Sequence, residues 1–92
     1  MAGKGERLAA SFGAALDGRA LERLRRARRQ RGEAALDSLR EALMYVTSPD
    51  TLDEIIERAR ELTAESESGV REKAAGFVRE AESVRETTRR QA

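Results

Sequence analysis

The chain has 92 residues, of which 38% are charged and 39% hydrophobic, and its formal net charge is +1. A chain of this length is expected to form a single helical domain over residues 1–92, since domains usually need on the order of 100 residues. It has no histidine and no cysteine, which excludes an imidazole base, a thiolate nucleophile, a disulfide and zinc, haem or iron–sulfur sites built from its own residues. We therefore expect no enzyme activity, no metal and no cofactor.

The apolar content is small, because alanine supplies 16 of the hydrophobic residues. Apolar burial contributes about 25 cal/mol per Å², while each ordered residue costs roughly 1.5 kcal/mol of conformational entropy. A lone chain of this composition is expected to be marginally stable. We therefore expect self-association, most simply as a two-fold symmetric dimer.

Charge is divided unequally along the chain. Residues 1–46 carry ten basic and six acidic side chains, whereas residues 47–92 carry eight and eleven. The basic N-terminal half and the acidic to mixed C-terminal half make the molecule a charge dipole. In a dimer, the basic half of one chain is expected to meet the acidic half of the other.

Helix-favouring residues dominate nearly every stretch, which predicts an all-α bundle of three to four helices. The first helix is expected over about 6–16, where Leu8 and Phe12 stand one helical turn apart. Asp17 and Gly18 are typical of a break or a capped restart. The alternative architecture is one or two long helices in an extended coiled coil.

The next helices are predicted over about 19–29 and 33–46, with a turn or kink near Gly32. Ser48 can cap the helix that follows, and Pro49 suits the first position of that helix. This fourth segment is expected to fade in a serine-rich stretch, with a turn over 66–69. We expect the core to hold Leu21, Leu24, Leu36, Leu39, Leu43, Val46, Leu52, Ile55, Ala59, Leu62, Phe77 and Val84. The cluster 43–46 is expected at its centre, and an exposed docking patch is the alternative.

The last segment has the most regular apolar pattern, with alternating spacings of four and three that are typical of a long coiled-coil helix. Packing against another helix is favoured over a membrane surface, because the alanines make the apolar stripe shallow. We interpret this stripe as a self-association seam. Its residues are Val70, Ala74, Phe77, Ala81 and Val84.

Seven arginines stand within thirteen residues: Arg19, Arg23, Arg25, Arg26, Arg28, Arg29 and Arg31. Guanidinium groups bind carboxylates and phosphates in bidentate fashion, so this stretch predicts contact with an acidic partner. Neutralisation by the acidic row of the helix over 50–65, either within the fold or across a dimer, is a second interpretation. That row consists of Asp53, Glu54, Glu57 and Glu61.

The same carboxylates do not predict a metal site, because Arg58 and Arg60 interrupt the acidic row and no calcium-loop motif is present. A solvated, salt-bridged helix face is the favoured interpretation of this segment. No stretch approaches the roughly 20 apolar residues that span a bilayer. We expect no integral membrane association and a cytoplasmic location.

These observations predict a non-catalytic helical interaction protein, such as an adaptor, a regulator or an assembly subunit. Its arginine-rich helix is expected to bind an acidic protein. The alternative is a DNA- or RNA-binding protein that contacts phosphates through residues 19–31. The protein interpretation is favoured because a strong net positive charge and interleaved aromatic residues are both lacking.

Overall fold

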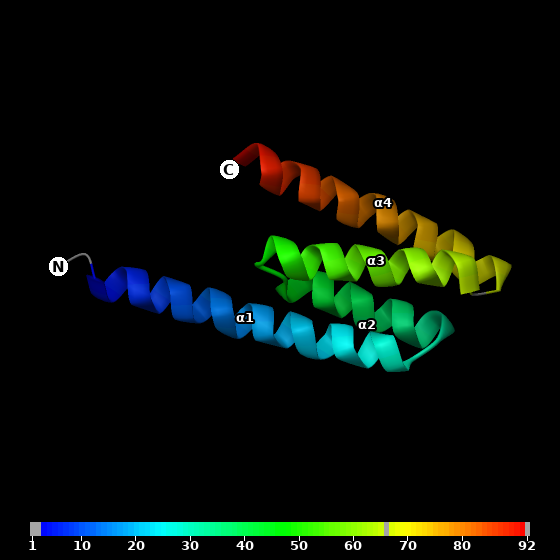
Figure 1. Ribbon diagram of the computed structural model, residues 1–92, viewed down its shortest axis with the longest axis horizontal. Coiled ribbons are helices and arrows are strands. Elements are labelled where there is room, and N and C mark those ends of the chain that lie inside the picture. The colour runs from blue at the N-terminus through cyan, green and yellow to red at the C-terminus, as the bar shows by residue number, and fades with distance from the viewer. Residues whose placement is uncertain (1–2, 66, 92) are drawn as a thin grey trace.

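The protein is a bundle of four α-helices in a computed structural model that describes the backbone of residues 3–65 and 67–91 and the side chains of residues 13–65 and 67–90 (Figure 1). The all-α bundle predicted from the sequence is thus confirmed, with four helices within the described residues. The helices are α1 (Gly3–Arg29), α2 (Gly32–Tyr45), α3 (Pro49–Glu65) and α4 (Ser68–Gln91).

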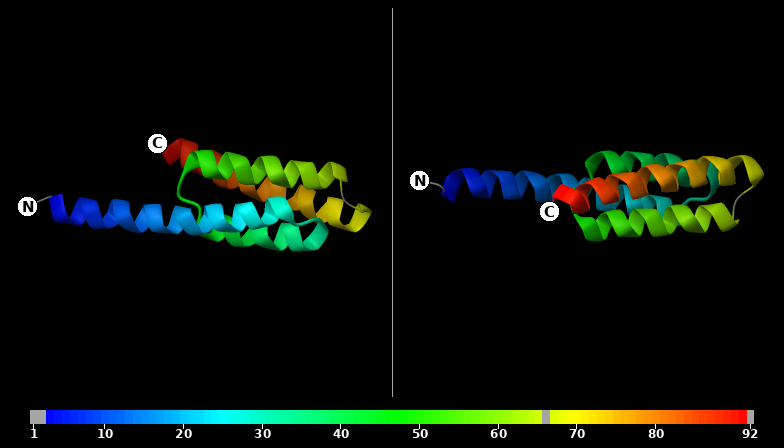
Figure 2. Two further views of the ribbon diagram at one scale, coloured as in Figure 1. Left: turned by 60° about the horizontal axis from the view of Figure 1, so that its bottom comes forward. Right: turned by 90° about the horizontal axis from the view of Figure 1, so that it is seen from above.

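The four helices form two antiparallel hairpins that pack against each other (Figure 2). Helices α1 and α2 make the first hairpin, and α3 and α4 make the second. Between the hairpins, α1 contacts α3, and α2 contacts both α3 and α4. Within the described residues α1 and α4 do not meet, so they occupy opposite corners of the bundle. Helices α1 and α3 are therefore neighbours that run in the same direction (Figure 1).

The core takes side chains from all four helices, and many of them are alanine. Small side chains let the helices approach closely, which explains how a sequence with few large apolar residues still forms a buried interior. The buried core cluster consists of Leu24, Ala27, Ala35, Leu36, Leu39, Ala42, Leu52, Ile55, Ile56, Ala59, Leu62, Ala74, Phe77 and Ala81.

Most of the predicted core is confirmed, with two corrections. Leu21, Leu43 and Val46 are half-buried and pack against the core cluster. Val84 is 38% exposed, so its predicted place in the core is wrong. Met44 is 77% exposed and lies outside the core that we expected the cluster 43–46 to form. Met44 follows a fully buried Ala42 and a half-buried neighbour, so the helical turn carries it to the solvent side.

The predicted chain breaks near Gly32 and at Ser48 and Pro49 coincide with the ends of helices. Gly32 has a φ of +61°, in the left-handed region that glycine adopts without steric strain. The turn predicted over 66–69 falls where α3 ends and α4 begins, and Ser66 itself lies outside the described residues. Short turns at these points explain the antiparallel hairpins.

The predicted break at Asp17 and Gly18 is wrong, because α1 runs through both residues. A glycine inside a helix costs only about 1 kcal/mol relative to alanine, and the buried face continues at Ala20 and Leu24. Helix α1 also extends well past the connection between α2 and α3 (Figure 1). The side chains of Leu8 and Phe12 lie outside the described ones.

Candidate interaction surface

The predicted arginine site occupies the C-terminal half of α1 and the residue before α2. Ala20, Leu24 and Ala27 fill the buried face of this part of α1. Because an α-helix has about 3.6 residues per turn, the residues between these positions point away from the core. Six of the seven arginines are accordingly exposed and Arg23 is half-buried.

On the side toward α2, the arginines are held by neighbouring groups. The Nε atom of Arg23 donates a hydrogen bond of 3.0 Å to Glu41. The guanidinium groups of Arg19 and Arg23 each lie 5.9 Å from the centre of the Tyr45 ring, within the range of cation–π attraction. Arg26 lies 4.0 Å from Glu22 on the same helix. These arginines are therefore partly satisfied within the chain.

On the side toward α3, one arginine is paired and its neighbours are not. Arg28 Nη2 lies 3.3 Å from Glu54 Oε1, which links α1 to α3. Arg25, Arg29 and Arg31 are exposed and have no ion pair with any carboxylate among the side chains that the structure describes. The unneutralised cations of the predicted site are thus concentrated in the last turns of α1 and the connection that follows it.

The acidic row of α3 neutralises this surface only at one point. Asp53 pairs with Arg85 of α4 at 2.9 Å, and Glu61 pairs with Arg58 of its own helix at 2.9 Å. Glu57 is exposed and has no ion pair among the described residues. Most of the row is therefore either engaged elsewhere or open to solvent.

Arg58 was expected on a solvated face, and that expectation is wrong because only 7% of this residue is exposed. Its Nε donates to the carbonyl oxygen of Ala27 at 3.2 Å, and its Nη2 donates to that of Gln30 at 2.9 Å. These carbonyls lie at the C-terminal end of α1, where helices lack intrahelical donors. The sequence signal was its position between Ile55 and Leu62 on the apolar face of α3.

Asp17 was interpreted only as a helix boundary, yet it joins α1 to the start of α3. Its carboxylate accepts hydrogen bonds from the backbone amides of Thr47 and Ser48 at 3.1 and 3.0 Å and from the Thr51 hydroxyl at 2.9 Å. Burial raises the pKa of Asp17, but these hydrogen bonds outweigh burial and hold that pKa below its ordinary value. No local sequence signal pairs positions that are 30 residues apart.

The residues of the predicted self-association seam lie mainly inside the chain's own core. Ala74, Phe77 and Ala81 are at most 3% exposed, and Val70 is half-buried. Val84 is the most exposed of the five. Packing against another helix is thus achieved within one chain, and a role of this seam in self-association stays a prediction.

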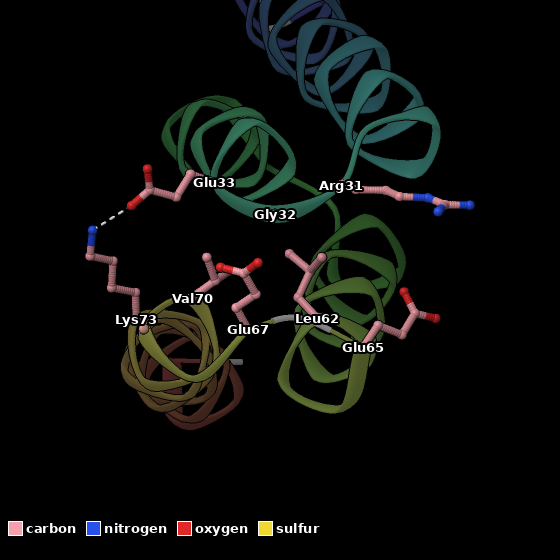
Figure 3. Close-up of a pocket in the computed structure, with 9 residues that line it drawn as sticks. Arg31, Gly32, Glu33, Leu62, Glu65, Glu67, Val70 and Lys73 are labelled. Carbon is pink, nitrogen blue, oxygen red and sulfur yellow. Dashed lines mark hydrogen bonds and ion pairs between the residues drawn. The ribbon is translucent and has the colours of Figure 1, made fainter.

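A cavity of about 880 Å³ opens where the turns of the two hairpins meet (Figure 3). Leu62, Val70 and Glu67 point into it. Lys73 donates a 2.5 Å hydrogen bond to Glu33 across its mouth and thereby lowers the pKa of that carboxylate. The cavity combines apolar side chains with charges of both signs, so its lining selects no single class of ligand.

Comparison with protein families, with curated proteins and with solved structures finds no match to this chain. Within the described residues, no group of acidic side chains is arranged to hold a metal ion. None of the helices, as far as the structure describes them, combines the length and the hydropathy that crossing a membrane requires. The geometry of the arginine surface is therefore the main guide to the function of this chain.

Proposed function

We propose that this chain is a non-catalytic interaction protein that binds an acidic protein surface through the arginines of α1 and of the short connection to α2. The observation that carries the proposal is the exposed set Arg25, Arg29 and Arg31, which has no acidic partner among the described side chains. Planar guanidinium groups one helical turn apart match carboxylates at the same spacing on another helix. The cytoplasmic location expected from the sequence stays a prediction.

The carboxylates around these arginines favour a protein over a nucleic acid as the partner. Glu22 lies on the exposed side of α1, and Glu41 and Glu54 flank it on the neighbouring helices. A phosphate backbone carries uniform negative charge and would be repelled by each of them. A protein can present cations opposite these carboxylates and anions opposite the arginines.

Binding of labelled probes tests the proposal. The probes are a glutamate-rich peptide that also carries lysines, a DNA duplex and a DNA single strand, each at about 50 and about 200 mM salt. We expect the peptide to bind at the lower salt concentration, and the double variant Arg25→Glu/Arg29→Glu to weaken that binding about tenfold or more. The matched control is Arg71→Glu/Arg79→Glu, which changes the net charge equally on α4.

Three outcomes contradict the proposal. Absence of peptide binding at the lower salt concentration removes it. Equal weakening by the α1 and α4 variants assigns binding to net charge rather than to this surface. Tight binding of DNA but not of the peptide, with a linear loss of log affinity against log salt concentration, establishes the nucleic-acid alternative.

A further inference from the structure

We propose that the acidic surface bound by α1 is helix α3 of a second copy of this chain, so that the protein forms a two-fold symmetric dimer through its α1/α3 face. The inference rests on the proposed function, since it uses the same arginines, and it names their partner. It also replaces the α4 seam as the surface through which the chain self-associates.

The α1/α3 face carries unpaired charges of both signs side by side. The ion pair between Arg28 and Glu54 joins the two helices. On α1, Arg25 lies one turn before Arg28 and also one turn before Arg29. On α3, Glu57 lies one turn after Glu54. Arg25, Arg29 and Glu57 are all exposed, and none of them has an ion pair among the described side chains.

The two helices have a fixed register that sets these charges at similar heights. At one end of the bundle, Asp17 is hydrogen-bonded to Ser48. At the other end, Arg58 is hydrogen-bonded to the carbonyl of Gln30. The unpaired arginines of α1 lie between these two links, and so does Glu57 on α3. The parallel helices thus present cations and a carboxylate at nearly the same level along the bundle.

A two-fold axis parallel to the helices would bring these opposite charges together across the interface. Rotation about such an axis leaves every residue at its height, and it places α1 of one copy opposite α3 of the other. The unpaired arginines of each copy then face Glu57 of its partner. The contact occurs twice and closes on itself, so the assembly stops at a dimer instead of growing into a filament.

The same side of α1 is sterically open. Ala14 and Gly18 precede Arg25 at helical spacing on this side, and both are exposed. A side-chain carbon added at Gly18 would meet no atom within 4 Å apart from its chain neighbours and the backbone of its own helix. A second helix can therefore approach closely. Because exposed ion pairs contribute little each and are screened by salt, we expect a weak dimer that dissociates as the salt concentration rises.

Sedimentation of two oppositely charged variants tests the arrangement. One variant is Arg25→Glu/Arg29→Glu, which replaces the two unpaired arginines of α1 by carboxylates. The other is Asp50→Arg/Glu57→Arg, which replaces two unpaired carboxylates of α3 by arginines; Asp50 is exposed and has no ion pair among the described residues. We expect the wild type to dimerise at about 50 mM salt, each variant alone to be monomeric, and their equimolar mixture to form a heterodimer. Circular dichroism of each variant checks that it is folded.

Disulfide trapping gives a readout that does not depend on net charge. The chain has no cysteine, so Arg29→Cys and Glu57→Cys can be introduced into separate chains. We expect the mixture to form a disulfide-linked heterodimer much faster than either chain forms a homodimer. The control pairs Arg29→Cys with Arg79→Cys on α4, and we expect no such preference.

The inference is overturned if the wild type stays monomeric at about 50 mM salt, if the mixed variants do not associate, or if Arg25→Glu/Arg29→Glu still dimerises. Its failure is distinguishable from that of the proposed function. A monomeric wild type that binds the glutamate-rich peptide, and loses that binding in Arg25→Glu/Arg29→Glu, retains the acidic-partner site and lacks only the self-docking.

Discussion

Asp17 shows how a single carboxylate fixes the entry of a helix. It accepts three hydrogen bonds from the chain around the start of α3, where the positive end of the helix dipole also favours an anion. Its pKa is held below the ordinary value in the folded chain. The folded chain therefore stabilises the ionised carboxylate of Asp17. This group adds to the free energy of unfolding at pH values above its pKa in the unfolded chain, and the contribution is lost as the pH falls through the lowered pKa of the folded chain.

We expect Asp17→Asn to lower the free energy of unfolding by about 1 kcal/mol at neutral pH. That difference from wild type shrinks as the pH falls below about 4, because the wild-type carboxyl is protonated as the pH passes through its lowered pKa. Urea unfolding at several pH values measures both effects. Asp37→Asn is the matched control, since Asp37 is exposed and has no ion pair among the described residues. A loss that does not change with pH would assign the effect to packing.

At the scale of the elements, α1 and α3 are linked at both ends of their contact. Asp17 of α1 binds the start of α3, and Arg58 of α3 binds the last carbonyls of α1. Each charge lies at the helix terminus of opposite polarity, which is the favourable arrangement. The two links fix the register of one hairpin on the other, a task that alanine-rich packing performs poorly because its surfaces are shallow.

We expect Arg58→Met to destabilise the bundle by about 2 kcal/mol. Methionine fills a similar volume but leaves the carbonyls of Ala27 and Gln30 without their donors, and an unsatisfied buried carbonyl costs about 1–3 kcal/mol. Arg58→Lys should recover part of this loss, since a lysine keeps the charge and loses the planar fork. Thermal unfolding compares the three proteins. Arg60→Met, a change at an exposed arginine of the same helix, should be nearly neutral.

The sequence predicted the helix boundaries well where an apolar helical pattern stops at a residue that favours a turn. Gly32 and Pro49 mark real ends because one has positive φ and the other cannot continue a preceding helix. Asp17 and Gly18 misled the prediction because the hydrogen-bond partners of Asp17 are about 30 residues away. The position of Arg58 on the apolar face of α3 indicated its burial, but its acceptors on Ala27 and Gln30 are brought near only by tertiary packing.

The candidate surface was predictable in composition and not in detail. Arginine density alone placed the site on residues 19–31. Which arginines remain unpaired depends on the neighbours that the fold provides, namely Tyr45 and Glu41 from α2 and Glu54 from α3. The α4 stripe was expected at a surface between chains, yet most of it lies inside, because a heptad pattern identifies a packed face without identifying its partner.

At the scale of the whole molecule, the core depends on few large side chains. Phe77 is the only aromatic residue in the buried core of the described chain, and it lies among leucines, isoleucines and alanines. Truncation of a buried phenylalanine costs about 3–5 kcal/mol, whereas domains of this size have a total stability of roughly 5–15 kcal/mol. A single substitution at this position thus removes a large share of the stability of the bundle.

We expect Phe77→Ala to move the urea unfolding midpoint to a much lower concentration while the transition stays cooperative, because the four helices share one core cluster. Met44→Ala is the control, since its 77% exposed side chain should change stability by less than about 0.5 kcal/mol. If the two variants unfold at the same midpoint, α4 does not pack as described. If Phe77→Ala instead unfolds in two steps, each hairpin has its own core, and the four helices do not share a single core.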